Sequence, residues 1–154
     1  MNKVKQAQIF LFLTIGMMAF WMFVATGYLL YIFMKEYTGG CHCGGVKYKF
    51  KSDQSVEIWN CNCSICDMIN YQHLFVKHEL FELISGDDLL LEYKFESGSA
   101  KHFFCKRCGI KSFYQPRSHP EMYSINLKCV DDPPEIKEVI YFDGINFEES
   151  IKNI

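Results

Sequence analysis

The sequence contains very little arginine. Of its 154 residues, 16 are lysine or arginine and 18 are acidic, and only Arg107 and Arg117 are arginines. Lys3 and Lys5 are the only charged residues before residue 35, so residues 35–154 carry 14 basic and 18 acidic residues, a formal charge of 14 − 18 = −4. This balance disfavours a general phosphate-binding surface, and nucleic acid is therefore not an expected partner.

The sequence also lacks internal repeats, low-complexity tracts and, after residue 34, any long stretch with helical periodicity. Short stretches that alternate, or that are rich in aromatic and β-branched residues, predict strands instead. They are residues 46–50, 56–59, 74–76, 81–84, 89–95, 102–104, 111–114, 122–127 and 138–142. Turn residues separate these stretches, for example at 85–88 and 131–134. We therefore predict a mainly β domain.

Residues 9–34 contain no charge. As a helix, these 26 residues would span roughly 39 Å, which exceeds the apolar core of a bilayer. We predict an N-terminal tail at 1–8, a single transmembrane helix at 9–34 and one domain at 35–154. A cleaved signal peptide, with Lys3 and Lys5 before it and cleavage near residues 25–27, is the alternative. The apolar run continues to Met34 and is therefore longer than the apolar part of a signal peptide usually is.

Seven of the eight cysteines lie in three tight clusters. These are Cys41 and Cys43, then Cys61, Cys63 and Cys66, and then Cys105 and Cys108. Zinc prefers four soft ligands in a tetrahedron, and closely spaced cysteine pairs can meet one ion. The two pairs predict one closed site with sulfurs roughly 3.5–4 Å apart. Such a site is structural, because it leaves no coordination position for a substrate.

The middle cluster, Cys61-Asn-Cys63-Ser-Ile-Cys66, supplies three ligands within six residues. A fourth position would then be open to water or substrate, as in working zinc sites. Three thiolates on a divalent ion carry a net charge of −1, and this soft shell should accept another thiolate readily. The predicted chemistry is therefore thiol chemistry. A second structural site, closed by Cys129 or by a histidine, is the alternative.

Two other interpretations of the cysteines fit less well. Disulfide scaffolds seldom concentrate their cysteines into three knots, and no βαβ pattern surrounds Cys105-x-x-Cys108 to favour a thioredoxin-like role. Cys129 stands alone and is interpreted as a small buried hydrophobic residue. His102, three residues before Cys105, is the histidine expected nearest a metal, and it is not assigned as a base.

Lysines flank both ends of the apolar segment, so the positive-inside rule does not decide its orientation. Paired thiols at metal-binding spacing suit a reducing compartment. We therefore expect the domain to face the cytosol.

The cysteine pattern resembles that of the glutathione-dependent formaldehyde-activating enzyme family, which also contains the centromere protein V group. The matching stretches are Gly40-Cys41-His-Cys43-Gly44, Cys61-Asn-Cys63-Ser-Ile-Cys66 and Phe104-Cys105-x-x-Cys108-Gly109. Gly86, Tyr93 and Phe95 fit the stretch typical between the clusters, and the resemblance runs from about Thr38 to Asp132.

This resemblance implies an all-β, Mss4-like fold built around zinc. It assigns Cys41, Cys43, Cys105 and Cys108 to a structural ion, and Cys61, Cys63 and Cys66 to a second, exchangeable one. The family's name-giving reaction adds formaldehyde to the thiol of glutathione, gives S-hydroxymethylglutathione and is classed with carbon–sulfur lyases. Other members are described as chromatin-associated. We therefore expect a single-pass membrane protein with two zinc ions, a small thiol such as glutathione as partner, and lyase-type activity. The alternative is a non-catalytic, zinc-stabilised binding module tethered to a membrane.

Overall fold

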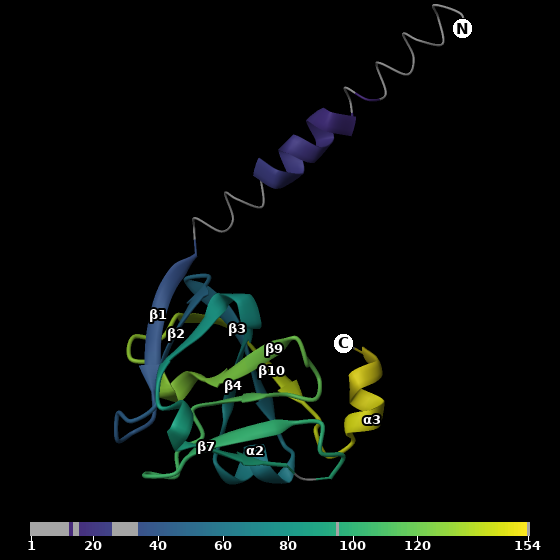
Figure 1. The fold of residues 1–154 in the computed structure, drawn as a ribbon. Coiled ribbons are helices and arrows are strands. Elements are labelled where there is room, and N and C mark those ends of the chain that lie inside the picture. The colour runs from purple at the N-terminus through teal and green to yellow at the C-terminus, as the bar shows by residue number, and fades with distance from the viewer. Residues whose placement is uncertain (1–12, 14–15, 26–33, 95, 154) are drawn as a thin grey trace, which may run out of the picture. The chain divides into compact units, whose positions relative to one another are not determined.

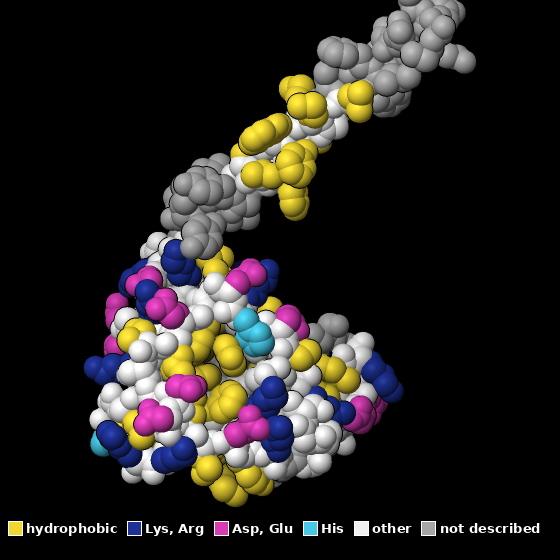
Figure 2. Space-filling view, in the orientation of Figure 1, with side chains coloured by type: hydrophobic (Ala, Val, Ile, Leu, Met, Phe, Trp, Pro, Cys, Tyr) yellow, Lys and Arg dark blue, Asp and Glu magenta, His cyan; other side chains and the backbone are white. Residues whose placement is uncertain are grey.

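The computed structural model describes residues 13, 16–25, 34–94 and 96–153. The chain divides into two compact units, Met1–Met34 and Lys35–Ile154. In the first unit, residues 13 and 16–25 are helical and their large hydrophobic side chains are exposed (Figure 2). Within the described part of the chain, no helix has the length and apolar character needed to cross a membrane. The predicted tail at 1–8 and residues 9–12, 14–15 and 26–33 of the predicted span lie outside the described residues, so the anchor stays a prediction.

The second unit contains two sheets (Figure 1). The smaller sheet has the order β1-β2-β5 and the larger has the order β10-β3-β4-β9-β8-β7-β6. Strands of the smaller sheet are β1 (Lys35–Gly40), β2 (Lys47–Ser52) and β5 (Phe81–Ser85). Those of the larger sheet are β3 (Ser55–Cys61), β4 (Gln72–Lys77), β6 (Leu90–Tyr93), β7 (Lys101–Cys105), β8 (Phe113–Gln115), β9 (Met122–Asn126) and β10 (Glu135–Phe142). Neighbouring strands are antiparallel except β10, which pairs in parallel with β3.

The helices of the second unit are short. They are α2 (Ser64–Met68), α3 (Phe147–Ser150) and the 3₁₀ turns η1 (His78–Leu80), η2 (Asp87–Leu89), η3 (Leu127–Cys129) and η4 (Ile151–Asn153). The predicted mainly β class is therefore confirmed, and each of the nine predicted strands overlaps an observed one. The sequence pattern missed β1, whose two glycines and flanking charges hide its alternation. Phe95, at the end of the predicted strand 89–95, lies outside the described residues.

An aromatic core joins the two sheets. Alternation along β2 turns Tyr48 and Phe50 to the same buried face, where each is at most 1% exposed. The Tyr48 ring lies 5.4 Å from that of Phe81 on β5 and 5.7 Å from that of Phe113 on β8. Its hydroxyl is also satisfied, because it donates to the backbone carbonyl of Cys129 at 3.3 Å. Burial of these rings from water stabilises the contact between the sheets.

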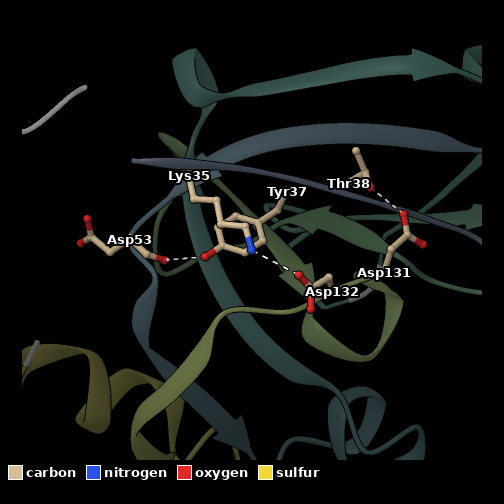
Figure 3. Close-up of polar contacts among 6 residues, drawn as sticks. All are labelled: Lys35, Tyr37, Thr38, Asp53, Asp131 and Asp132. Carbon is tan, nitrogen blue, oxygen red and sulfur yellow. Dashed lines mark hydrogen bonds and ion pairs between the residues drawn. The ribbon is translucent and has the colours of Figure 1, made fainter. Parts of the chain in front are cut away.

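Polar contacts fasten β1 to the segment that follows η3 (Figure 3). The Thr38 hydroxyl donates to Asp131 Oδ2 at 2.7 Å, and the Asp131 N–H donates to the Thr38 carbonyl at 2.9 Å. Lys35 Nζ lies 3.2 Å from Asp132 Oδ2, an exposed ion pair that contributes little by itself. The Tyr37 hydroxyl donates to the backbone carbonyl of Asp53 at 3.3 Å. These contacts hold the first part of β1, and the strand leads directly into Cys41.

Candidate metal centres and the adjoining cavity

Four cysteines from two segments that are far apart in the sequence meet at one point. The sulfurs of Cys41, Cys43, Cys105 and Cys108 all lie within 4.8 Å of one another. Cys43 Sγ is 3.5 Å from Cys41 Sγ and 3.7 Å from Cys105 Sγ. Zinc–sulfur bonds of about 2.3 Å place tetrahedral neighbours about 3.8 Å apart, so these distances fit a zinc ion. All eight cysteines are free thiols.

Two tight loops bring these thiols together. In the loop after β1, the Cys41 N–H donates to the Val46 carbonyl at 3.0 Å, and the Val46 N–H points to Cys41 Sγ at 3.2 Å. In the loop after β7, Gly109 adopts a φ of 72° and its N–H donates to the Cys105 carbonyl at 2.8 Å. Glycine adopts this conformation without strain. The Val46 N–H therefore faces the Cys41 thiol, and this contact favours the ionised form of that thiol.

The middle cluster forms a second group. The sulfurs of Cys61, Cys63 and Cys66 also lie within 4.8 Å of one another. Cys61 ends β3, Cys63 immediately precedes α2, and Cys66 is buried within α2. Hydrogen bonds from the Cys61 and Cys66 thiols hold the pKa of Cys63 far below its ordinary value. One thiolate is thus already favoured before any metal binds, which suits a metal-binding set.

No fourth protein ligand joins this group among the described residues. Cys129 belongs to neither group, and burial raises its pKa to about 11. Cys129 is interpreted from the sequence as a small buried hydrophobic residue rather than a ligand, and the structure places it outside both groups but only partly buried. Among the described residues, neither Cys129 nor a histidine joins the three sulfurs, so the structure gives no support to the alternative in which one of them closes a second structural site.

A loop after β10 closes over the three-cysteine group, and sequence reasoning missed it. The Asn62 side chain donates to Asp143 Oδ1 at 2.9 Å and accepts from the Ile145 N–H at 3.1 Å. Gly144 packs so closely that a β-carbon there would collide with Cys61 Sγ. The only local signal is the Asp143-Gly144 pair after a predicted strand, which is typical of any turn.

A cavity of about 300 Å³ adjoins the three thiols. Its lining includes Cys61, Cys63 and Cys66 together with side chains from β3, β4, β8, β10 and α3. Five aromatic side chains form part of its wall: Trp59, Phe75, Tyr114, Phe142 and Phe147. A largely apolar cavity with a few convergent polar groups is typical of a small-molecule site.

Lys111 is a buried cation behind this cavity. Lys111 is 3% exposed. Its Nζ lies 3.0 Å from His102 Nδ1 and 4.1 Å from the centre of the Tyr114 ring. Burial lowers the pKa of Lys111 to about 8, and the thiolates of Cys66, Cys63 and Cys61 oppose that shift. Among the described residues, no carboxylate forms an ion pair with Lys111. The negative charge that favours a charged Lys111 therefore comes from the three-cysteine group.

Two buried histidines line the same cavity. His102 stacks on Tyr114 with ring centres 4.7 Å apart, and burial followed by the Lys111 charge lowers its pKa to about 4. His73 Nδ1 forms a hydrogen bond with Ser124 Oγ at 3.0 Å, and burial lowers the pKa of His73 to about 3. Both imidazoles are therefore neutral near pH 7. The expectation that His102 lies near a metal group fits its place in this cavity, whereas His73 carried no signal in the sequence.

The comparisons with known proteins agree with this architecture. A crystal structure of a Rhodobacter sphaeroides protein matches with a TM-score of 0.59 and 28% sequence identity, over 66% of this chain and 98% of that chain. The family model described as glutathione-dependent formaldehyde-activating enzyme matches residues 36–143, a range that contains all seven clustered cysteines. The chain therefore belongs to the glutathione-dependent formaldehyde-activating enzyme family.

Proposed function

We propose that this protein is a carbon–sulfur lyase-type enzyme that acts on a glutathione–aldehyde adduct such as S-hydroxymethylglutathione. The observation that carries the proposal is the contrast between the two thiol groups. One contains four cysteines, whereas the other contains three, has no fourth ligand among the described residues and lines a cavity. Family membership supports a thiol partner.

Two zinc ions per chain form part of this proposal. Cys41, Cys43, Cys105 and Cys108 would hold a structural ion, and Cys61, Cys63 and Cys66 would hold an exchangeable one. When bound at the second group, zinc would stabilise the thiolate form of a substrate thiol. The chain's own contribution is charge balance, because Lys111 supplies one positive charge beside three thiolates and a divalent ion.

The overall reaction balances without an oxidant or a reductant. The substrate thiol gives up its proton, and its sulfur forms a bond to the aldehyde carbon. The electron pair of the C=O π bond moves to the oxygen, which takes up a proton and becomes the hydroxyl of the adduct. In the reverse direction, the same carbon–sulfur bond breaks and the C=O bond re-forms.

A non-catalytic binding module is the second candidate. The observation that favours it is the protonation state of the cavity, since both lining histidines have pKa values far below neutrality. Neither imidazole is therefore poised to exchange a proton at pH 7. Binding of a thiol without any turnover would be the function in that case.

We also propose that residues 9–34 anchor the protein as a single-pass helix with the metal-binding domain in the cytosol. The support is the uncharged run of 26 residues and the seven clustered thiols, which a reducing compartment would protect.

The test is the rate at which formaldehyde and glutathione combine, measured by NMR exchange with and without full-length protein. We expect a rate above the uncatalysed one, loss of the excess in Cys63→Ser, and retention in the matched control Cys129→Ser. Glutathione should bind, and S-methylglutathione should bind more weakly because a thioether is a poorer zinc ligand than a thiolate. Glutathione binding without rate enhancement would favour the module. If glutathione does not bind and the rate is not enhanced, both proposed functions are contradicted.

A further inference from the structure

We propose that the cavity beside Cys61, Cys63 and Cys66 binds the substituent of an aldehyde larger than formaldehyde, with an aromatic or bulky apolar group against the aromatic wall and the aldehyde oxygen at Nε2 of His73. This inference rests on the proposed thiol–aldehyde chemistry and names the substrate class.

The first support is the aromatic wall. Trp59 on β3 stacks on Phe142 of β10, with ring centres 5.4 Å apart and planes 27° apart. Phe75 on β4 meets Trp59 edge to face at 5.2 Å, and Phe147 of α3 meets Phe142 in the same way at 5.8 Å. These four rings are half-buried and line the cavity. Such a wall gains little from formaldehyde, which has no carbon substituent to bury.

The second support is the size of the cavity and the place of its charges. A volume of about 300 Å³ is roughly ten times the share of one water molecule in the liquid, whereas formaldehyde has only two heavy atoms. The charged lining residues are the exposed Glu96 and the half-buried Arg117, which pairs with Glu148 and lies 4.2 Å from the centre of the Phe147 ring. The charged peptide part of glutathione therefore suits the rim. The apolar interior remains for the group carried by the aldehyde.

The third support is one nitrogen atom. His73 is 3% exposed and lines the cavity, yet its Nε2 has no hydrogen-bond partner among the described residues. Its other nitrogen lies 3.0 Å from Ser124 Oγ and 3.3 Å from the Tyr114 hydroxyl, so the ring is already oriented. The ring also stacks on Phe75, with centres 6.0 Å apart and planes 18° apart. A buried polar atom is normally paired, and an oxygen next to an apolar group would pair this one.

The role of His73 is to hold the oxygen, and it consumes no proton. As the carbon–sulfur bond forms, the C=O π pair moves to the oxygen, and the proton released by the thiol ends on that oxygen. A neutral imidazole Nε2 can donate a hydrogen bond to the aldehyde oxygen and keep this contact to the adduct hydroxyl. In the reverse reaction the same contact accompanies re-formation of the aldehyde.

The first arm of the test compares two thioethers on the full-length protein, S-benzylglutathione and S-methylglutathione, by calorimetry. They share the peptide and the sulfur chemistry and differ in the ring. We expect the benzyl compound to bind at least about tenfold more tightly, as expected for burial of an aromatic ring. Phe142→Ala, or the milder Phe142→Leu if the former fails to fold, should remove most of that difference. The neighbouring Tyr141→Ala, whose side chain is 81% exposed, should preserve it.

The second arm adds one oxygen to the same carbon, with S-benzoylglutathione as the probe. In the unmodified protein and in His73→Gln, the benzoyl compound should bind more tightly than the benzyl compound. In His73→Phe, the two compounds should bind with equal affinity. Equal affinities of the two thioethers in a protein that binds glutathione would overturn the aromatic inference alone. Equal affinities of the benzoyl and benzyl compounds would overturn the role of His73. A protein that binds neither glutathione nor any analogue would overturn the proposed function itself.

Discussion

At the scale of single residues, the most consequential side chain is Lys111. A lysine ammonium is rarely buried without an anion, because desolvation strongly disfavours the charged form. Here the nearby groups are a neutral imidazole, two tyrosine rings and the thiols of the three-cysteine group. The charge of the lysine would therefore compensate the net negative charge of three thiolates on a divalent ion.

We predict that Lys111→Met weakens zinc binding at Cys61, Cys63 and Cys66 by about tenfold or more. The reason is that losing a buried counter-charge costs more free energy than losing a surface ion pair. Competition with a chelator, followed by metal analysis, measures this. The four-cysteine site should keep its ion. Lys128→Met, which removes an exposed lysine, is the control and should change neither site. Unchanged affinity in Lys111→Met would refute the charge-balance argument.

His102 makes a prediction about pH. Burial lowers its pKa to about 4 in the folded chain, against about 6.5 when exposed. Below pH 6.5 this histidine therefore binds more protons in the unfolded chain than in the folded one, so its effect is to lower the stability of the folded chain as the pH falls from 6.5 towards 4. We expect His102→Gln to lose less stability than the unmodified protein between pH 7 and pH 5. Denaturant unfolding at both values tests this, and equal losses would contradict it.

At the scale of elements, the four-cysteine group ties the loop after β1 to the loop after β7. Metal bound there is folding free energy, because it joins segments 62 residues apart. We predict that Cys105→Ser severely destabilises residues 35–154, whereas Cys66→Ser is less damaging, since its group spans only six residues. Thermal unfolding measures both variants. Similar destabilisation by the two changes would undo the division into a structural and a working site.

The loop after β10 gives a second prediction for an element. Alanine at Gly144 would place a β-carbon against Cys61 Sγ and close to the β-carbon of Cys63. We expect Gly144→Ala to displace that loop or the thiol, so that zinc at the three-cysteine group is lost while zinc at the four-cysteine group remains. Metal stoichiometry falling from about two to about one per chain would show this. Retention of both ions would show that the loop yields without disturbing the thiols.

At the scale of the whole molecule, the proposed anchor at residues 9–34 gives a prediction about location. We predict that the full-length protein resists carbonate extraction from membranes, because its uncharged run of 26 residues exceeds the thickness of the apolar core. A chain that begins at Lys35 should be soluble. Recovery of soluble protein trimmed near Gly27 would instead identify a signal peptide, and it would revive the disulfide interpretation of the cysteines.

The sequence by itself determined the features that depend on close spacing along the chain. Strand alternation identified nine of the ten strands. Successive side chains of a strand point to opposite faces, so a strand with one buried face alternates between apolar and polar residues. The spacing of Cys61, Cys63 and Cys66 predicted that they share one ion, since residues this close meet within a single turn. The sequence also predicted that the two cysteine pairs meet, because each pair supplies half of a tetrahedron. The structure brings their four sulfurs together.

Only the tertiary structure decided what surrounds the three thiols. Lys111, His73 and Gly144 come from three distant parts of the chain, and each looks like an ordinary residue of a strand or turn in its local sequence. Pairing of β10 with β3 carries the Gly144 loop over Cys61, and pairing of β4 with β9 sets His73 beside Ser124. Strand order and register depend on the packing of the entire core, which no local pattern encodes. The cavity and its aromatic wall are therefore properties of the fold.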